Sequence, residues 1–262
     1  MNHAIYTITA GALAFQKRFD TIANNLANVN TNGFKKQNIT FSSMLPLDKT
    51  ENKYKQEYPD EIKKGVFNTF PYTDIIKTDF SEGYLKHTGN KLDFAIAGKG
   101  FFMVKDANGD IKFTRNGNFT VNKDGFLVTK KGQQVLDFKR NPIKIDMTNA
   151  EFINVDEKGN IYINDVLQGQ VAVMDFDDYS VLQRVGYTDF KINPQITPKP
   201  VPRQSQEYEI ESGYLEGSNV NIVRQMTAMI EVQRHYQVTQ KVITTIDQQL
   251  DSKAVNDVGR AI

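Results

Sequence analysis

The two ends of this 262-residue chain carry the pattern that most constrains its fold. In the first thirty residues, apolar side chains recur at alternating steps of three and four, which is the heptad seam of a coiled-coil helix. The seam runs for more than three heptads, so we expect a long helix that pairs along this face. Its members are Ile5, Ile8, Ala12, Phe15, Phe19, Ile22, Leu26 and Val29.

The C-terminal stretch repeats the pattern, and we expect it to form the partner helix. This seam is less pure because Gln225 and Thr239 occupy positions where apolar residues are expected. Ser218 or Asn219 is suited to cap the start of the helix. The apolar members of the seam are Ile222, Met229, Val232, Tyr236, Ile243, Ile246 and Leu250.

A comparison of magnitudes indicates that these helices need partners. Each seam side chain contributes about 1.5–3 kcal/mol when it is fully buried. Ordering the backbone of the first helix costs roughly 1–2 kcal/mol for each residue. A single helix with its seam in water would therefore be largely disordered, so we expect pairing of the helices and further packing between chains. The simpler alternative is two amphipathic helices packed on one globular body.

The segment "TIANNLANVNTNGFKK" (residues 21–36) is unusually rich in asparagine, a mediocre helix former. Its amides combine donors and acceptors, so they can satisfy backbone groups at a helix end or bridge tightly packed chains. We favour crowded helix–helix contact in an assembly. Gly33 follows at a suitable distance to end the helix. The asparagines off the seam are Asn24, Asn25, Asn28, Asn30 and Asn32.

The middle of the chain changes from a polar arm to a β-rich region. Residues 35–80 are charge-mixed, without a long apolar period, and predict an extended arm with a few short strands. From residue 81 onward, short strand-like runs flank Asn108-Gly109, Asp124-Gly125 and Lys158-Gly159, which are typical hairpin turns. These runs predict an antiparallel β domain.

The predicted architecture is therefore nested and of the α+β class. Residues 1–34 and 216–262 form a discontinuous coiled-coil module, residues 35–80 an arm, and residues 81–212 a central antiparallel β domain. A tract at 193–204 holds half of the eight prolines and should be a stiff return linker.

The sequence offers no constellation of residues for catalysis, a cofactor or a metal. The formal net charge is +1, which gives no overall attraction to nucleic acid, and there is no cysteine. The three histidines lack ligand-spaced partners, and "DANGD" (106–110) lacks the glycine and the final carboxylate of a calcium loop. The N-terminus does not have the features of a cleavable signal peptide. We expect neither an enzyme nor a small-molecule or nucleic-acid binder.

Four segments resemble the flagellar rod and hook axial proteins of bacteria. They are "ANNLANVNTNGFKK" (23–36), "LDFAIAGKGFFMV" (92–104), "FTRNGNFTVNKDGFLV" (113–128) and "SGYLEGSNVNIVRQMTAMIEVQRHYQ" (212–237). The similarity covers most of the chain in the family's order. The length is more similar to the rod proteins than to the longer hook protein, and the two end sequences are more similar to the proximal-rod type than to the distal-rod type. The residues that carry the N-terminal motif are Asn24, Asn25, Leu26, Ala27, Asn28, Asn30, Thr31, Gly33 and Phe34.

The resemblance implies a structural subunit of the basal-body rod that polymerises helically in the periplasm and transmits motor torque. It implies partners among copies of itself and other rod proteins, and export through the flagellar type III apparatus without a cleaved signal. The alternative from another class is a β-sandwich module that binds the cell wall from a coiled-coil stalk.

Overall fold

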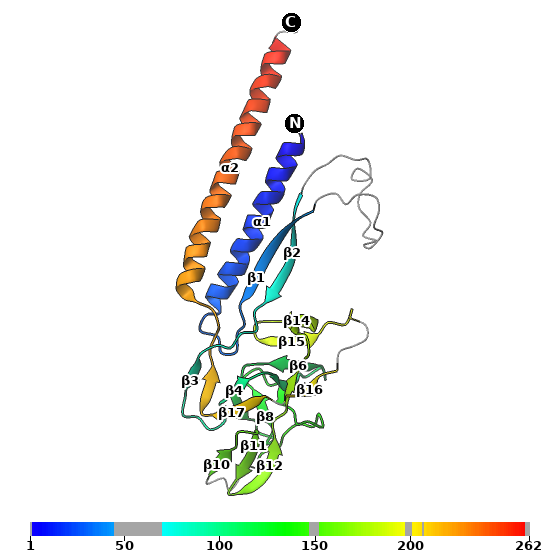
Figure 1. The fold of residues 1–262 in the computed structure, drawn as a ribbon, viewed down its shortest axis with the longest axis vertical. Helices are drawn as coiled ribbons and strands as arrows, with labels where there is room; N and C mark the ends of the chain where they lie inside the picture. The colour runs from blue at the N-terminus through cyan, green and yellow to red at the C-terminus, as the bar shows by residue number, and fades with distance from the viewer. Residues whose placement is uncertain (1, 45–69, 147–151, 197–200, 206, 260–262) are drawn as a thin grey trace. The chain divides into compact units, whose positions relative to one another are not determined.

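The computed structural model describes residues 2–44, 70–146, 152–196, 201–205 and 207–259 (Figure 1). The chain divides into two compact units, and each is described by itself. The helical unit comprises Met1–Leu26, Gln37–Lys77 and Ile222–Ile262, and the β unit comprises Ala27–Lys36 and Thr78–Asn221.

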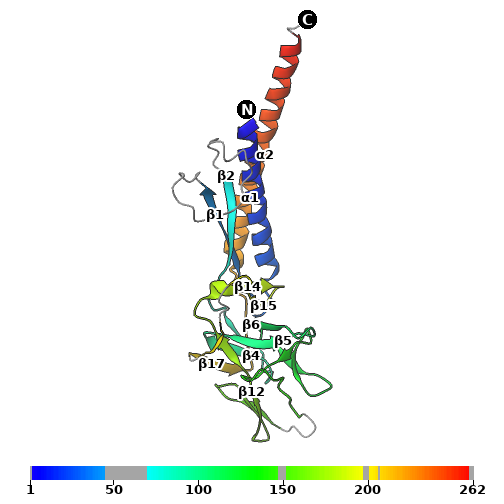
Figure 2. The ribbon, with the colours of Figure 1, turned by 90° about the vertical axis from the view of Figure 1, so that its right-hand side faces the viewer.

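Two long helices dominate the helical unit. Helix α1 (Asn2–Ala27) and helix α2 (Ile222–Gly259) lie side by side and run antiparallel (Figures 1 and 2). They have 26 and 38 residues, so α2 is about 18 Å longer at a rise of 1.5 Å per residue, and it continues past the first residue of α1. This packing of the two terminal helices confirms the helical half of the predicted α+β fold.

A two-stranded ribbon completes the described part of the helical unit. Strands β1 (Gln37–Met44) and β2 (Phe70–Thr78) pair with each other and occupy both ends of the predicted arm. The rest of that arm, 45–69, lies outside the described residues.

The β unit is built from antiparallel strand pairs, as predicted. Its largest sheet has nine strands, with the path β14-β15-β6-β5-β9-β8-β7 and with β13 and β16 attached beside β5. These strands are β5 (Phe101–Lys105), β6 (Ile111–Thr114), β7 (Phe119–Val121), β8 (Leu127–Thr129), β9 (Gln134–Val135), β13 (Val173–Asp175), β14 (Leu182–Val185), β15 (Asp189–Ile192) and β16 (Arg203–Gln204).

Three smaller sheets accompany it. One has the order β10-β11-β12, a second pairs β17 with β4, and a third pairs β18 with β3. A short 3-10 helix, Tyr179–Val181, precedes β14. The strands are β3 (Leu85–His87), β4 (Phe94–Gly98), β10 (Ile153–Val155), β11 (Asn160–Ile163), β12 (Val166–Gln170), β17 (Tyr208–Ser212) and β18 (Tyr214–Glu216).

The three predicted hairpin turns are confirmed, and they share one geometry. In the β5–β6 turn, the amide of Asp106 donates to the carbonyl of Asp110, and the Asp106 carboxylate accepts from the amides of Asn108 and Asp110, all at 3.0 Å. Gly109 takes φ +89°, a conformation that side chains disfavour. Asn122 and Asp156 play the part of Asp106 in the other two turns.

Two apolar cores lie on either side of β5, because successive side chains of a strand point to opposite faces. The first gathers around Phe102 and Val104, and the second around Phe101 and Met103. Further members of the first core are Phe94, Phe119, Leu127 and Ile161, and further members of the second are Phe113, Leu136 and Phe190. The β unit therefore has a closely packed interior of its own.

Both helix boundaries near the β unit differ from the prediction. Helix α1 ends at Ala27, so Val29 lies beyond it in a turn, in which the amide of Thr31 donates to the carbonyl of Asn28 at 3.1 Å. Helix α2 begins at Ile222, so neither Ser218 nor Asn219 stands at its cap position. The hydroxyls of Thr31 and Ser218 bond within their own turns, and the Asn219 side chain bonds to other chain segments, so these residues do not extend the helices.

Candidate functional site: the helix pair and the Glu216 cluster

The predicted seam of α1 faces the interior of the helical unit only in part. Ala12 and Ile22 are buried. Four further members are half-buried, namely Ile8, Phe15, Phe19 and Leu26, and the side chain of Ile5 lies outside the described residues. Phe15 stacks on His235 of α2, with ring centroids 5.4 Å apart, so the seam of α1 does face α2.

The seam of α2 is covered less. Among the described side chains of α2, Val232 is the buried apolar residue, at 1% exposure. Met229, Tyr236, Ile243 and Ile246 are half-buried, Ile222 is 46% exposed, and the side chain of Leu250 lies outside the described residues. The single chain therefore leaves much of this seam accessible, and its role in assembly stays a prediction.

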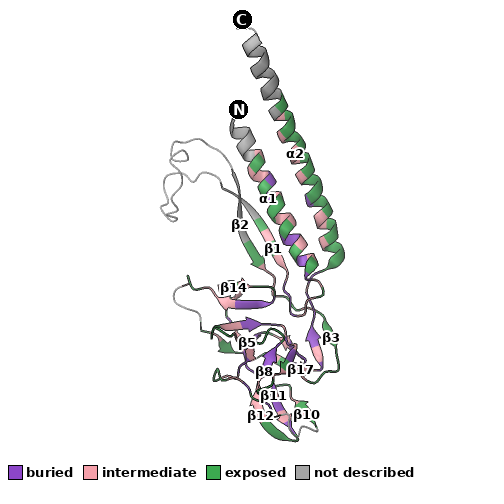
Figure 3. Ribbon diagram, turned by 180° about the vertical axis from the view of Figure 1, so that it is seen from behind, coloured by how far each residue is buried: buried purple, intermediate pink, exposed green. Residues whose placement is uncertain are grey.

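A second apolar stripe, made of Val223, Met226 and Ile230, runs along the first turns of α2. These side chains are 72%, 52% and 52% exposed. Each lies one residue after a seam position, so the stripe borders the seam on the same helix. Figure 3 shows exposed residues along most of the described length of α2. The stripe is an apolar surface that the rest of the described helical unit leaves open to solvent.

Asn25 shows what one of the motif asparagines does. Its side chain is 1% exposed and pairs with the backbone of Gln37 in both directions, at 2.8 Å from Nδ2 to the carbonyl and 2.9 Å from the amide to Oδ1. Its Nδ2 also donates to Oε1 of Gln225 at 3.4 Å. Asn25 thus joins α1 to the start of β1 and to the polar seam position of α2, which is backbone satisfaction within one chain.

The second half of the N-terminal motif belongs to the β unit. Asn28 is buried and accepts a hydrogen bond from the Thr31 hydroxyl at 3.2 Å. Gly33 takes φ +69°, and a Cβ there would lie 2.4 Å from the amide nitrogen of Asn116. Only glycine fits this close approach. Asn24, Ala27 and Asn30 are exposed, and Leu26 is half-buried.

The guanidinium of Arg184 lies against the rings of both Phe34 and Phe190. Phe34 is fully buried, and the Arg184 guanidinium lies 4.8 Å from its ring centroid and 5.2 Å from that of Phe190. Arg184 donates to the carbonyls of Lys35 and Tyr187. Burial lowers the pKa of Arg184 to about 10. The motif therefore ends inside the β unit with its backbone fixed.

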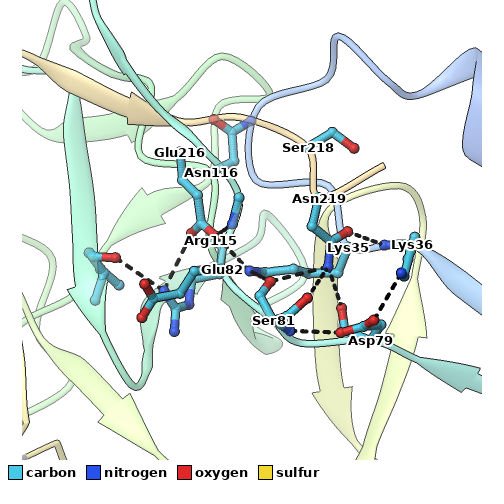
Figure 4. A network of polar contacts seen from close by, with 12 residues as sticks. Lys35, Lys36, Asp79, Ser81, Glu82, Arg115, Asn116, Glu216, Ser218 and Asn219 are labelled. Carbon is cyan, nitrogen blue, oxygen red and sulfur yellow. Dashed lines mark hydrogen bonds and ion pairs between the residues drawn. The ribbon is translucent and has the colours of Figure 1, made fainter. Parts of the chain in front are cut away.

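A buried ionic group, the Glu216 cluster, consists of Lys35, Arg115 and Glu216. All three are at most 3% exposed. The Lys35 ammonium lies 2.5 Å from Oε1 of Glu216, and Arg115 Nη1 lies 3.3 Å from Oε2 (Figure 4). Arg115 also donates to the carbonyls of Ile96 and Gly98 on β4, at 3.2 and 2.8 Å.

Two cations share one carboxylate in this cluster. Burial is the largest cause of a lowered pKa at Lys35, Glu216 opposes it, and Arg115 adds to it. A buried ion pair is weak evidence for stability, since desolvation of the charges offsets their attraction. Removing one partner is expensive because the remaining charge is left uncompensated. The cluster is therefore better suited to fixing a geometry than to adding net stability.

Asn219 binds two neighbouring segments beside the cluster, one with Lys36 and one with Asp79 and Ser81. Its Oδ1 accepts from the amide of Lys36 at 2.7 Å, and its Nδ2 donates to the carbonyls of Asp79 and Ser81 at 2.8 and 3.1 Å (Figure 4). Desolvation raises the pKa of Asp79, but hydrogen bonds from Ser81 and the nearby Lys36 ammonium outweigh it and lower that pKa. The Lys36–Asp79 ion pair spans 3.2 Å.

The Glu216 cluster was not predicted from the sequence. Arg115 and Glu216 are the only charged residues of the stretches 113–122 and 212–223, which marks both positions but does not say which residues they pair with. Within the part of the chain that the structure describes, no group of three or more His, Asp and Glu side chains is placed to hold a metal ion. No described helix is long and apolar enough to cross a membrane.

These features define a class: an axial structural protein in which paired terminal helices with open apolar faces accompany an independent β unit. Comparison with family models agrees. The model "Flagella basal body rod protein" matches residues 5–35, "Flagellar hook protein FlgE/F/G D1 domain" matches 95–163, and "Flagellar basal body rod FlgEFG protein C-terminal" matches 211–256.

Whole-chain relatives give the same result. The chain is 31% identical to the basal-body rod protein FlgF of Caulobacter vibrioides over 99% of both chains. It is 32% identical to FlgG of Agrobacterium fabrum over 94% of this chain and 95% of the relative. It is 31% identical to FlgG of Bacillus subtilis over 95% and 96%. The chain belongs to the flagellar basal-body rod protein family, whose members are structural proteins of the rod and not enzymes.

Proposed function

We propose that this rod protein polymerises through α1 and α2, which pack against the helices of neighbouring rod subunits. The observation that carries the proposal is the stripe of Val223, Met226 and Ile230, which lies open beside the seam. The free energy falls when apolar helix faces leave water, and neighbouring helices offer a complementary surface. Head-to-tail contacts of this kind produce a helical filament when they do not close a ring.

The finer parts of the proposal follow from family membership and from the sequence. The rod crosses the periplasm and transmits motor torque, and its subunits leave through the flagellar type III apparatus without a cleaved signal. Partners are further copies of this chain and other rod proteins. Relatives named FlgF and FlgG match equally well, and the end sequences favour the proximal-rod type. Family membership favours this function over the cell-wall-binding module.

The test is Met226→Asp in a strain that lacks the wild-type copy. Met226 is exposed in the single chain, so the circular dichroism of the purified variant should match the wild type. A carboxylate buried between subunits is costly, so we expect the variant to be missing from purified basal bodies and the cells not to swim.

The matched control is Asn108→Asp, which adds the same charge in an exposed turn of the β unit. The control should enter the rod and support swimming. Normal incorporation of the Met226→Asp protein would overturn the assignment of this stripe to subunit packing.

A further inference from the structure

The β unit continues into the helical unit at four points of the chain, after residues 26, 36, 77 and 221. These points belong to three connecting segments: 27–36, 78–83 and 213–221. Such segments are ordinarily the loosest parts of a two-unit chain, because few contacts hold a linker. Here, two side chains of the third segment, Glu216 and Asn219, bind the other two segments.

Glu216 binds both other connecting segments. Its Oε1 accepts from the Lys35 ammonium at 2.5 Å and from the amide of Gly83 at 2.9 Å. Its backbone carbonyl accepts from the amide of Gly33 at 2.7 Å. Lys35 in turn donates to the carbonyl of Ser81 at 2.6 Å, which joins the first segment to the second.

Asn219 repeats this arrangement a few residues later. It holds the amide of Lys36 and the carbonyls of Asp79 and Ser81, while the Asp79 amide donates to the Lys36 carbonyl at 2.9 Å. Arg115 anchors Glu216 to β4. Each segment is thus bonded to both others (Figure 4), and Arg115 bonds the set to β4.

We propose that Glu216 and Asn219 form a coupling element that keeps the three connecting segments from sliding past one another when the rod turns under load. The proposal rests on the function proposed above. Connecting segments that are free to shift would bend easily, whereas segments joined by directional hydrogen bonds resist shear. The bonds of Lys35 and Arg115 to Glu216 are buried, so water does not compete for them.

The element has a specific chemical requirement beyond an ion pair. The position of Glu216 must accept a backbone N–H from Gly83, and the position of Lys35 must donate to a backbone carbonyl of Ser81. Exchanging the charges of residues 35 and 216 would keep an ion pair between them. It would, however, place an ammonium at the N–H of Gly83 and a carboxylate at the carbonyl of Ser81. Arg115 would then face a cation.

The test measures amide hydrogen exchange of the full-length protein and swimming at low and raised viscosity. The variants are Lys35→Met and Asn219→Ala. Asn219→Ala should speed exchange at Lys36, and Lys35→Met should speed exchange at Gly33 and Gly83, each roughly tenfold or more. Exchange at Val104 in the sheet should stay slow in both. Rods should form in normal number, and swimming should fall below wild type only at raised viscosity.

The control is Lys112→Met, which breaks the Lys112–Asp106 ion pair in the β5–β6 hairpin, away from the connecting segments. It should change neither exchange in those segments nor swimming under load. The charge exchange Lys35→Glu with Glu216→Lys should behave like the single variants.

The outcomes separate cleanly. The coupling element would be overturned if Lys35→Met and Asn219→Ala swam like the wild type at raised viscosity, or if exchange at Gly33, Lys36 and Gly83 stayed unchanged. It would also be overturned if the charge-exchange variant behaved like the wild type in both measurements. Failure of both single variants to form rods would overturn it too, since the segments would then act in folding or assembly. None of these results affects the Met226→Asp test, which asks only whether a subunit enters the rod.

Discussion

Phe102 in the β unit and Val232 in α2 are both at most 1% exposed to solvent, but their surroundings differ. Phe102 lies among more than a dozen buried apolar residues of its core, and its ring packs on Phe119 with centroids 5.2 Å apart. Val232 is the only buried apolar residue among the described side chains of α2, a helix of 38 residues. One unit completes its interior within the chain, and the other leaves apolar surface exposed.

The comparison fits a division of labour. An interior that closes within one chain is stable before assembly, because burial offsets the entropy of ordering the strands. Helices that expose apolar faces gain further burial only when another surface covers those faces, and short-range propensity alone holds a helix poorly. The predictions below test this contrast, from the largest expected effect to the smallest.

Truncation in the β core should have the largest effect. Phe102→Ala removes a fully buried ring and should lower the free energy of unfolding by about 3–5 kcal/mol. Urea unfolding of the full-length protein, followed by near-ultraviolet circular dichroism, measures the change. Phe152→Ala is the control, since Phe152 is 74% exposed and its removal should leave the midpoint unchanged. Equal effects at both positions would contradict a closed β core.

The turn of the N-terminal motif should be the next most sensitive position. Gly33→Ala combines a left-handed backbone with a Cβ 2.4 Å from Asn116, so we expect a loss of roughly 2–5 kcal/mol in the same unfolding measurement. Gly132→Ala has a similar φ of +79° but open space around the Cβ, so it should lose only about 1–2 kcal/mol. If the two variants were equally stable, close packing would not explain Gly33.

The same kind of truncation in α2 should do less to the isolated chain. Val232→Ala removes two methyl groups from the helix pair, so we expect a loss of about 1–2 kcal/mol. The measurement is the thermal loss of ellipticity at 222 nm, with near-ultraviolet signals from the β unit unchanged. A simultaneous loss of the β signal would show that the two units unfold together and would weaken the contrast.

Alkaline pH should produce the smallest effect, confined to the β unit. Desolvation, and then a 2.8 Å hydrogen bond to Asp175, raises the pKa of Tyr179 to about 12. Between pH 10 and pH 12 the unfolded chain loses this proton while the folded chain keeps it, so stability falls as pH rises. Tyr179→Phe should remove part of that fall in urea unfolding at pH 9 and pH 11. An identical fall in the variant would contradict the shift.

The sequence by itself determined the elements whose signals are local. The heptad spacing from Ile5 to Val29 predicted α1, although the helix ends at Ala27. The paired apolar ends predicted α2 beside it, and the glycine turns predicted three β hairpins. The four family motifs identified the rod family. Each of these signals follows from a repeating pattern or from a residue with a special backbone conformation.

Only the tertiary structure decided which polar residues meet. Lys35, Arg115 and Glu216 are far apart in the chain, and nothing in their local sequence predicts an ion pair at 2.5 Å. The end of α1 at Ala27 and the use of Asn219 to bind Lys36 were also decided there. The physical reason is that a buried charge or amide must find its partner wherever the fold brings one, and that choice depends on contacts between distant segments.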